Sequence, residues 1–71
     1  DSIVSGTSLG RLVSAAKEAA RAAIEAAKAA NACSVNPTAH SAMVLAQAAA
    51  NTSAKAARLN TAALEVSSSF L

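Results

Sequence analysis

The chain has one cysteine and one histidine, Cys33 and His40, and no other side chains suggest catalysis. A cysteine with a neighbouring histidine can act as a nucleophile with its general base. However, no acidic residue lies near them in the sequence to orient the imidazole, and no glycine-rich turn suggests an oxyanion hole. We therefore expect that the protein is not an enzyme.

The same residues are too few for a metal site. One cysteine and one histidine form an incomplete ligand set, and Glu18, Glu25 and Glu65 are dispersed along the chain. No cofactor and no small-molecule substrate are indicated. Because a single cysteine cannot form a disulfide within the chain, Cys33 is interpreted either as a small apolar residue or as an interchain disulfide. We interpret His40 as a solvent-facing residue in the first turn of a helix.

Charge and composition exclude several kinds of partner. The net charge is only +2, the basic residues are spread along the chain and interleaved with acidic ones, and Phe70 is the single aromatic residue, so we expect no nucleic-acid binding. No charged residue lies between Lys28 and Lys55, but that segment is too rich in Ser, Thr, Asn and Gln to span a membrane. The chain begins with Asp1 and not with methionine, which favours a processed or excised product and a secreted or cell-surface location.

The sequence consists of two alanine-rich stretches with one interruption between them. Alanine accounts for 22 of the 71 residues, and Pro37 separates two long alanine-rich stretches. Alanine has the highest helix propensity and proline stops a helix, so the sequence predicts an all-α fold. The expected single domain has an arm at 1–8, a helix at 9–31, a loop at 32–36 and a second helix at 37–70. A loop this short makes the two helices antiparallel, which predicts a two-helix hairpin.

The expected helix ends depend on capping residues. Ser8 or Thr7 is a candidate N-cap for the first helix, and Asn31 is a candidate left-handed residue at its end. Asn36 is the predicted N-cap of the second helix, with Pro37 in its first position.

Apolar residues recur at alternating spacings of three and four, which predicts an alanine-rich coiled coil. The predicted seam comprises Leu9, Val13, Ala16, Ala20, Ala23, Ala27 and Ala30 in the first helix, and Ala42, Leu45, Ala49, Thr52, Ala56, Leu59, Ala63, Val66 and Phe70 in the second. Folding the chain about residues 34–35 then pairs Ala16 with Thr52 and Leu9 with Leu59.

This hairpin would leave apolar surface without a partner. The second helix is predicted to be longer than the first, so that its last ten or so residues overhang. A second apolar stripe, Met43, Ala50, Ala57, Leu64 and Leu71, recurs every seven residues on that helix. We therefore expect copies of the chain to complete a bundle or filament, as a self-associating structural subunit and homo-oligomer. The predicted self-association residues are Met43, Leu64, Val66, Phe70 and Leu71.

Three family resemblances keep other roles open. The segment "NTSAKAARLNTAALE" (51–65) resembles fish type I antifreeze proteins, which implies ice binding, although the threonines of this chain lack the 11-residue repeat of that family. The segment "SVNPTAHSAMVLAQAAANTSAK" (34–55) resembles the layout of type III secretion needle subunits, which implies a filament subunit of a cell-surface appendage. The segment "LVSAAKEAARAAIEAAKAA" (12–30) is similar to talin-type rod helices, and a helical adaptor that accepts a partner helix is the further alternative.

Overall fold

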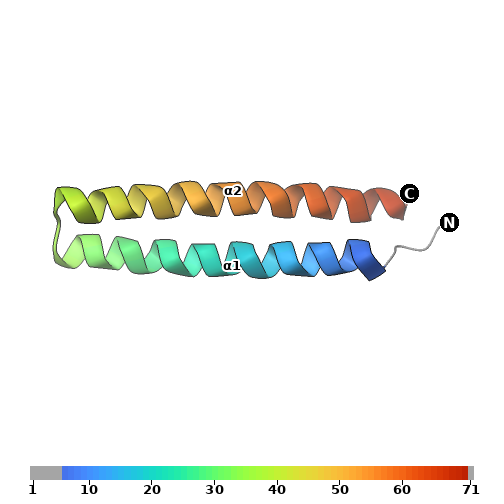
Figure 1. Ribbon diagram of the computed structural model, residues 1–71, viewed down its shortest axis with the longest axis horizontal. Helices are drawn as coiled ribbons and strands as arrows, with labels where there is room; N and C mark the ends of the chain where they lie inside the picture. The colour runs from blue at the N-terminus through green and yellow to red at the C-terminus, as the bar shows by residue number, and fades with distance from the viewer. Residues whose placement is uncertain (1–5, 71) are drawn as a thin grey trace.

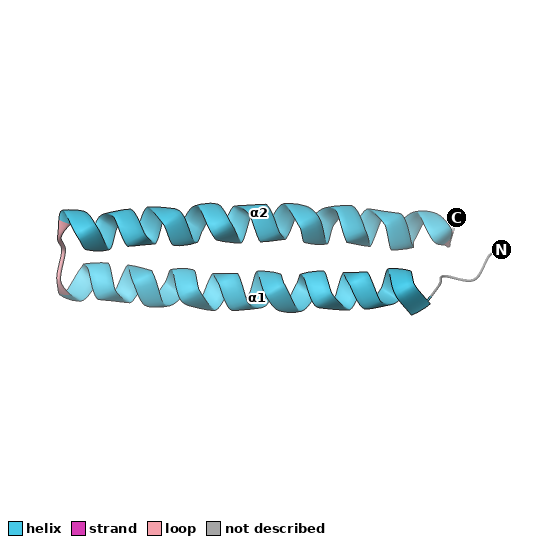
Figure 2. Ribbon diagram, viewed as in Figure 1, coloured by secondary structure: helices cyan, strands magenta, loops and turns pink. Residues whose placement is uncertain are grey.

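The computed structural model describes residues 6–70, and these form two α-helices joined by a tight turn. The helices are α1 (Gly6–Val35, 30 residues) and α2 (Ala39–Ser69, 31 residues). They lie antiparallel and side by side along their whole length (Figure 1), and no strand occurs in the described part of the chain (Figure 2). The predicted all-α antiparallel hairpin is confirmed.

The first helix is longer than the predicted range of 9–31. It takes in residues 6–8 of the expected arm and residues 32–35 of the expected loop, whereas residues 1–5 of that arm lie outside the described residues. A proline disfavours helical conformation only in the residue before it, so α1 continues up to Asn36. The Asn36 N–H still donates to the carbonyl oxygen of Ala32, at 3.0 Å. Because the two helices have nearly equal lengths, the predicted overhang of the second helix is wrong.

The start of α2 is set by a capping box, and the prediction of Asn36 as its N-cap is wrong. The Ser41 N–H donates to the hydroxyl oxygen of Thr38 at 2.9 Å, and the Thr38 N–H donates to the hydroxyl oxygen of Ser41 at 2.9 Å. Two backbone donors without helical partners are thereby satisfied. Pro37 lies just before this cap. Asn31 is inside α1, and no residue in the described part of the chain has a positive φ.

Removal of this cap should destabilise the hairpin. We expect Thr38→Ala to cost about 1 kcal/mol, because it removes the hydroxyl that accepts from the Ser41 N–H, one of the two hydrogen bonds of the capping box. The midpoint of thermal unfolding, followed by circular dichroism, should fall by roughly 4 to 8 °C. Thr61→Ala is the matched control, since Thr61 is exposed in the middle of α2 and bonds only to the carbonyl of Ala57 in its own helix. Equal midpoints for the two variants would contradict the capping role.

The interface between the helices consists of one regular stripe of residues on each helix. Among residues 7–70, sixteen positions are buried or half-buried, and every other position is exposed. On α1 they are Ser8, Leu12, Ala15, Ala19, Ala22, Ala26, Ala29 and Cys33, and on α2 they are Ser41, Leu45, Ala48, Thr52, Lys55, Leu59, Ala62 and Val66. Spacings of four and three alternate throughout both stripes, as predicted. The residues predicted for the seam on α1 were wrong, because that stripe lies one residue further along the helix and is exposed. On α2 the prediction was wrong for the five exposed residues Ala42, Ala49, Ala56, Ala63 and Phe70.

One hydrogen bond fixes the register of the helices. The Thr52 hydroxyl lies 3.0 Å from the carbonyl oxygen of Ala22 on α1 and 2.9 Å from that of Ala48 on its own helix, so its proton is shared between them. Thr52 is therefore level with Ala22, and not with Ala16 as predicted. A side chain as short as threonine reaches the backbone of the other helix only where the two helices approach closely. Small interface residues, above all alanine, permit that approach.

The core formed in this way is small. Its most buried residues are Ala22, Ala29, Ala62 and Val66, which are 4% to 9% exposed, and no side chain of the described residues is completely buried. Three of the four are alanines, which contribute one methyl group each. At roughly 25 cal/mol per Å² of apolar surface, so little side-chain burial provides only modest stabilisation.

Candidate functional site

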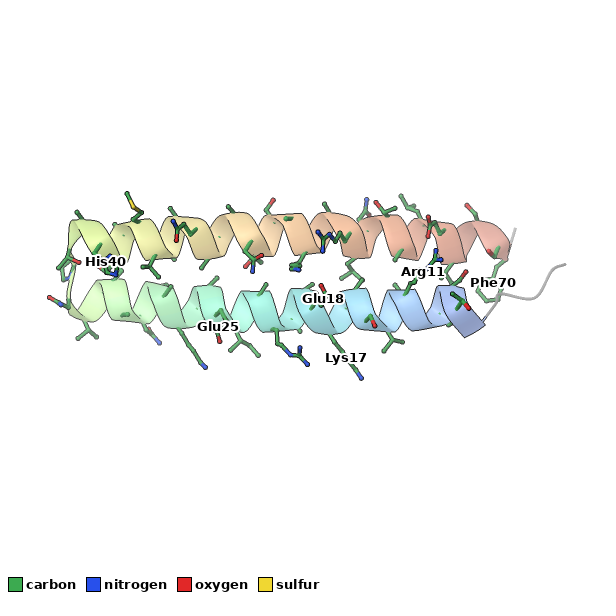
Figure 3. The ribbon with its side chains drawn as sticks, in the orientation of Figure 1. Arg11, Lys17, Glu18, Glu25, His40 and Phe70 are labelled. Carbon is green, nitrogen blue, oxygen red and sulfur yellow. The ribbon has the colours of Figure 1, made fainter. Side chains whose placement is uncertain are left out.

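The two residues with catalytic potential lie at the turn end of the hairpin. Cys33 is the last interface residue of α1, is half-buried and is a free thiol, and His40 is exposed in the first turn of α2 (Figure 3). Within residues 6–70, no three His, Cys, Asp or Glu side chains come close enough together to hold a metal ion. Neither helix in that range combines the length and the apolar character that crossing a membrane would require.

The predicted self-association residues are divided between the surface and the interface. Met43, Leu64 and Phe70 are 61% to 70% exposed. Val66 is only 8% exposed and packs between α1 and α2, so its side chain is not available to another molecule. Leu71 lies outside the described residues.

The hairpin has two broad faces, which follow from the position of each residue relative to the interface. Residues that directly precede an interface position lie on one side of each helix, and residues that directly follow one lie on the other side. Because the helices are antiparallel, the residues that precede interface positions lie on the same face of the hairpin in both helices. The residues that follow interface positions lie on the opposite face. The 4.0 Å contact between Arg58 and Glu18, which both precede an interface position, agrees with this geometry.

The first of these faces holds most of the charge, and we call it the charged face. It includes seven of the nine charged residues in the described range: Arg11, Glu18, Arg21, Glu25, Lys28, Arg58 and Glu65. Lys17 lies on the outer edge of α1 and points away from α2 (Figure 3), and Lys55 is an interface residue. The signs are mixed, so the charged face has no strong preference for acidic or basic partners.

An ion pair on the charged face joins the two helices. The Lys55 ammonium donates a hydrogen bond to Glu18 Oε1 at 3.1 Å. This hydrogen bond and the charge of Lys55 lower the pKa of Glu18, and the nearby charges of Arg58 and Arg21 lower it further. A second pair, Lys28 with Glu25 at 3.5 Å, lies within α1 and does not connect the helices.

The lowered pKa of Glu18 predicts a pH dependence of stability. The ordinary glutamate pKa is about 4.3, so the contribution of the ionised pair is present above that value and is lost as the pH falls through the lowered pKa of the folded state. The midpoint of thermal unfolding of the native protein should therefore fall below about pH 4.3, and Glu18→Gln should reduce this dependence on pH. Glu25→Gln removes an equal charge without breaking a contact between helices and is the control. The prediction fails if both variants show the same pH profile.

The hollows of the surface follow the charged face. Two open depressions share Arg11, Ala15 and Arg58 in their lining, and a third is lined by residues around Glu18 and Lys55. These are the grooves between charged side chains along the helix pair. Their shape does not enclose a ligand, and ligand sites are normally concave and mostly apolar.

The opposite face carries no charge along the whole described hairpin, and we call it the uncharged face. Its members are Leu9, Val13, Ala16, Ala20, Ala23, Ala27, Ala30 and Ser34 of α1, Ala42, Ala46, Ala49, Ser53, Ala56, Asn60, Ala63 and Ser67 of α2, and Phe70 directly after the end of α2. All of them are exposed. Much of this face was predicted as the seam itself, since its residues repeat with the same spacing as the true interface. The sequence predicted a second apolar stripe on the second helix at Met43, Ala50, Ala57, Leu64 and Leu71, but it did not indicate which of the equally spaced stripes the hairpin buries.

The threonines do not gather on the uncharged face. Thr38 belongs to the capping box, Thr52 lies in the interface, and Thr7 and Thr61 are on the charged face. A regular threonine array for ice binding is therefore absent from the described residues. The stripe of Met43, Ala50, Ala57 and Leu64 lies on the outer edge of α2, opposite the interface.

The comparisons with known proteins give no relative from which a function could be inferred. No protein-family model matches the chain, and neither a curated protein nor a solved structure is significantly similar to it. The class that the fold defines is the α-helical hairpin. Since one fold can serve many functions, the function has to be argued from the surfaces just described.

Proposed function

We propose that the protein is a non-enzymatic structural subunit that associates with copies of itself, by coiled-coil packing, into a helical bundle or filament. The observation that carries this proposal is how little surface the hairpin buries. Among residues 7–70, only sixteen positions are buried or half-buried, and every other position is exposed. A rod of two helices therefore exposes more of its surface than a compact molecule of the same mass.

The character of the exposed surface supports the same proposal. Single exposed apolar residues are normal, but here the exposed large ones outnumber those in the core. They are Leu9, Val13, Ile24, Val35, Met43, Val44, Leu64 and Phe70. A hairpin that buries little but alanine and still exposes these side chains gains stability when a second chain covers them.

Sedimentation equilibrium over a range of concentrations tests the proposal. The expected mass is a multiple of 6.9 kDa that falls toward the monomer value on dilution. The double variant Leu64→Ser with Phe70→Ser should shift the equilibrium to the monomer, and Asn31→Ser, a polar and exposed position on α1, should not. A folded native protein that stays at 6.9 kDa at every concentration would refute the proposal. An unchanged mass in the double variant would show that association uses other residues.

A second candidate function is ice binding, which the uncharged and alanine-rich face favours. Inhibition of ice recrystallisation by the monomeric protein tests this candidate. The absence of threonines from that face among residues 7–70 makes self-association the better supported function.

A further inference from the structure

The uncharged face has apolar anchors as well as alanines. Leu9 and Val13 lie near the start of α1, and Phe70 follows the end of α2. Because the helices are antiparallel, all three belong to the open end of the hairpin, where Phe70 extends toward the start of α1 (Figure 3). The rest of the face consists mainly of alanine, with the polar residues Ser34 on α1 and Ser53, Asn60 and Ser67 on α2.

The distribution of charge restricts what can cover this face. Binding of a partner with a charged surface would remove water from its charges, and the uncharged face has no opposite charge to pair with them. The free energy of binding would therefore be unfavourable. A second uncharged face of the same chain leaves no charge unpaired. The charged faces of both copies would then remain in water, where mixed charges keep the assembly soluble.

The dimensions of the hairpin agree with contact between two copies. The helices have 30 and 31 residues, which at 1.5 Å per residue makes the hairpin about 45 Å long, and its width of 13 Å gives one broad face an area of about 600 Å². Two such faces in contact would bury roughly 1,200 Å² in total, which is the lower end of the range of about 1,200 to 2,000 Å² for specific protein interfaces. The short alanine side chains allow helices of the two copies to approach to about 8 Å, the lower end of normal helix packing.

We infer that a second copy of the chain docks on the uncharged face, so that two hairpins form a four-helix bundle with their charged faces outward. This inference rests on the proposed self-association and specifies its surface. The contact is isologous, because the same face is used by both copies. Phe70 lies inside this contact, whereas Met43 and Leu64, on the outer edge of α2, lie outside it.

Two exposed residues of α1 form a matched pair for testing the surface. Val13 lies on the uncharged face and is 51% exposed, and Ile24 lies on the outer edge and is 55% exposed. Both are β-branched and helical, so substitution by glutamate changes helix propensity similarly. We expect Val13→Glu to raise the dissociation constant of the dimer at least tenfold, because each copy would bury an unpaired carboxylate. Ile24→Glu should leave the dissociation constant within about twofold of the native value.

A second pair of variants covers the case in which Val13→Glu fails to fold. Ala20→Gln places a long polar side chain in the middle of the uncharged face, and Ala54→Gln places the same side chain on the opposite face. Glutamine is a good helix former, so circular dichroism should show folded helices in both variants. Only Ala20→Gln should weaken association, as measured by sedimentation equilibrium.

The outcomes separate this inference from the proposed function. If the native protein associates and only Val13→Glu and Ala20→Gln weaken it, the uncharged face is the contact. If the native protein associates and the four variants behave alike, or Ile24→Glu and Ala54→Gln weaken it more, the inference is wrong and self-association stands. A native protein that is folded and monomeric at every concentration overturns both the proposed self-association and the inferred contact face. Loss of ice recrystallisation inhibition in a monomeric Val13→Glu would assign the face to ice instead.

Discussion

Ala22→Leu is expected to destabilise the hairpin by about 1 to 3 kcal/mol, the usual cost of forcing extra methylene groups into a packed site. Ala22 is 4% exposed, and its carbonyl oxygen lies 3.0 Å from the Thr52 hydroxyl of the other helix. A leucine side chain would have to push α2 away and would break that hydrogen bond. In a chain of this size the midpoint of thermal unfolding should fall by on the order of 10 °C or more.

Ala54→Leu is the control for this substitution. Ala54 is an exposed residue of α2, and leucine there projects into solvent and keeps good helix propensity. Its unfolding midpoint should stay close to that of the native protein. If both variants melted at the same temperature as the native protein, the close alanine contact between α1 and α2 would be refuted.

Leu59→Ala should have the second largest effect. Leu59 is one of the few large side chains in the interface, where the register places it level with Ala15. Its truncation should cost about 2 kcal/mol, the lower end of the range for leucine in a core, since Leu59 is only half-buried. Urea unfolding followed by circular dichroism measures this loss.

Leu64→Ala is the matched substitution outside the interface. Leu64 is on the same helix and is 61% exposed, so its truncation should barely change the stability of the hairpin at low protein concentration. A loss of stability as large as that of Leu59→Ala would place Leu64 in the interface and contradict the register.

The architecture of this protein could be predicted because its signals are strong and local. Alanine content predicts helices, Pro37 predicts a turn, and a short turn predicts antiparallel packing. The alternating spacing of three and four also describes the real interface. Four of the residues predicted for the α2 seam, Leu45, Thr52, Leu59 and Val66, do lie in it.

The choice of stripe on α1 could not be predicted from the pattern because alanine is abundant on both sides of the helix. The stripe from Leu9 to Ala30 and the stripe from Ser8 to Cys33 have the same spacing and nearly the same composition. Two polar contacts distinguish them: Thr52 reaches the backbone at Ala22, and Lys55 pairs with Glu18. Such contacts depend on how the helices are rotated about their axes, which the apolar pattern alone leaves open.

The boundaries of α1 were wrong for a different reason. The turn was centred on residues 34–35, but only the residue before Pro37 is excluded from helical conformation, and the Thr38 capping box starts α2 directly after it. The turn therefore occupies residues 36–38. This displacement is enough to change the partner of every interface residue.

The central claim is that this hairpin is too small to be stable alone and is completed by copies of itself. Thermal unfolding measured by circular dichroism over about a hundredfold range of protein concentration tests it most directly, since association stabilises the folded state by mass action. We predict that the unfolding midpoint rises steadily with concentration. A high midpoint that is the same at every concentration would show that a single hairpin is stable by itself, and would contradict the claim.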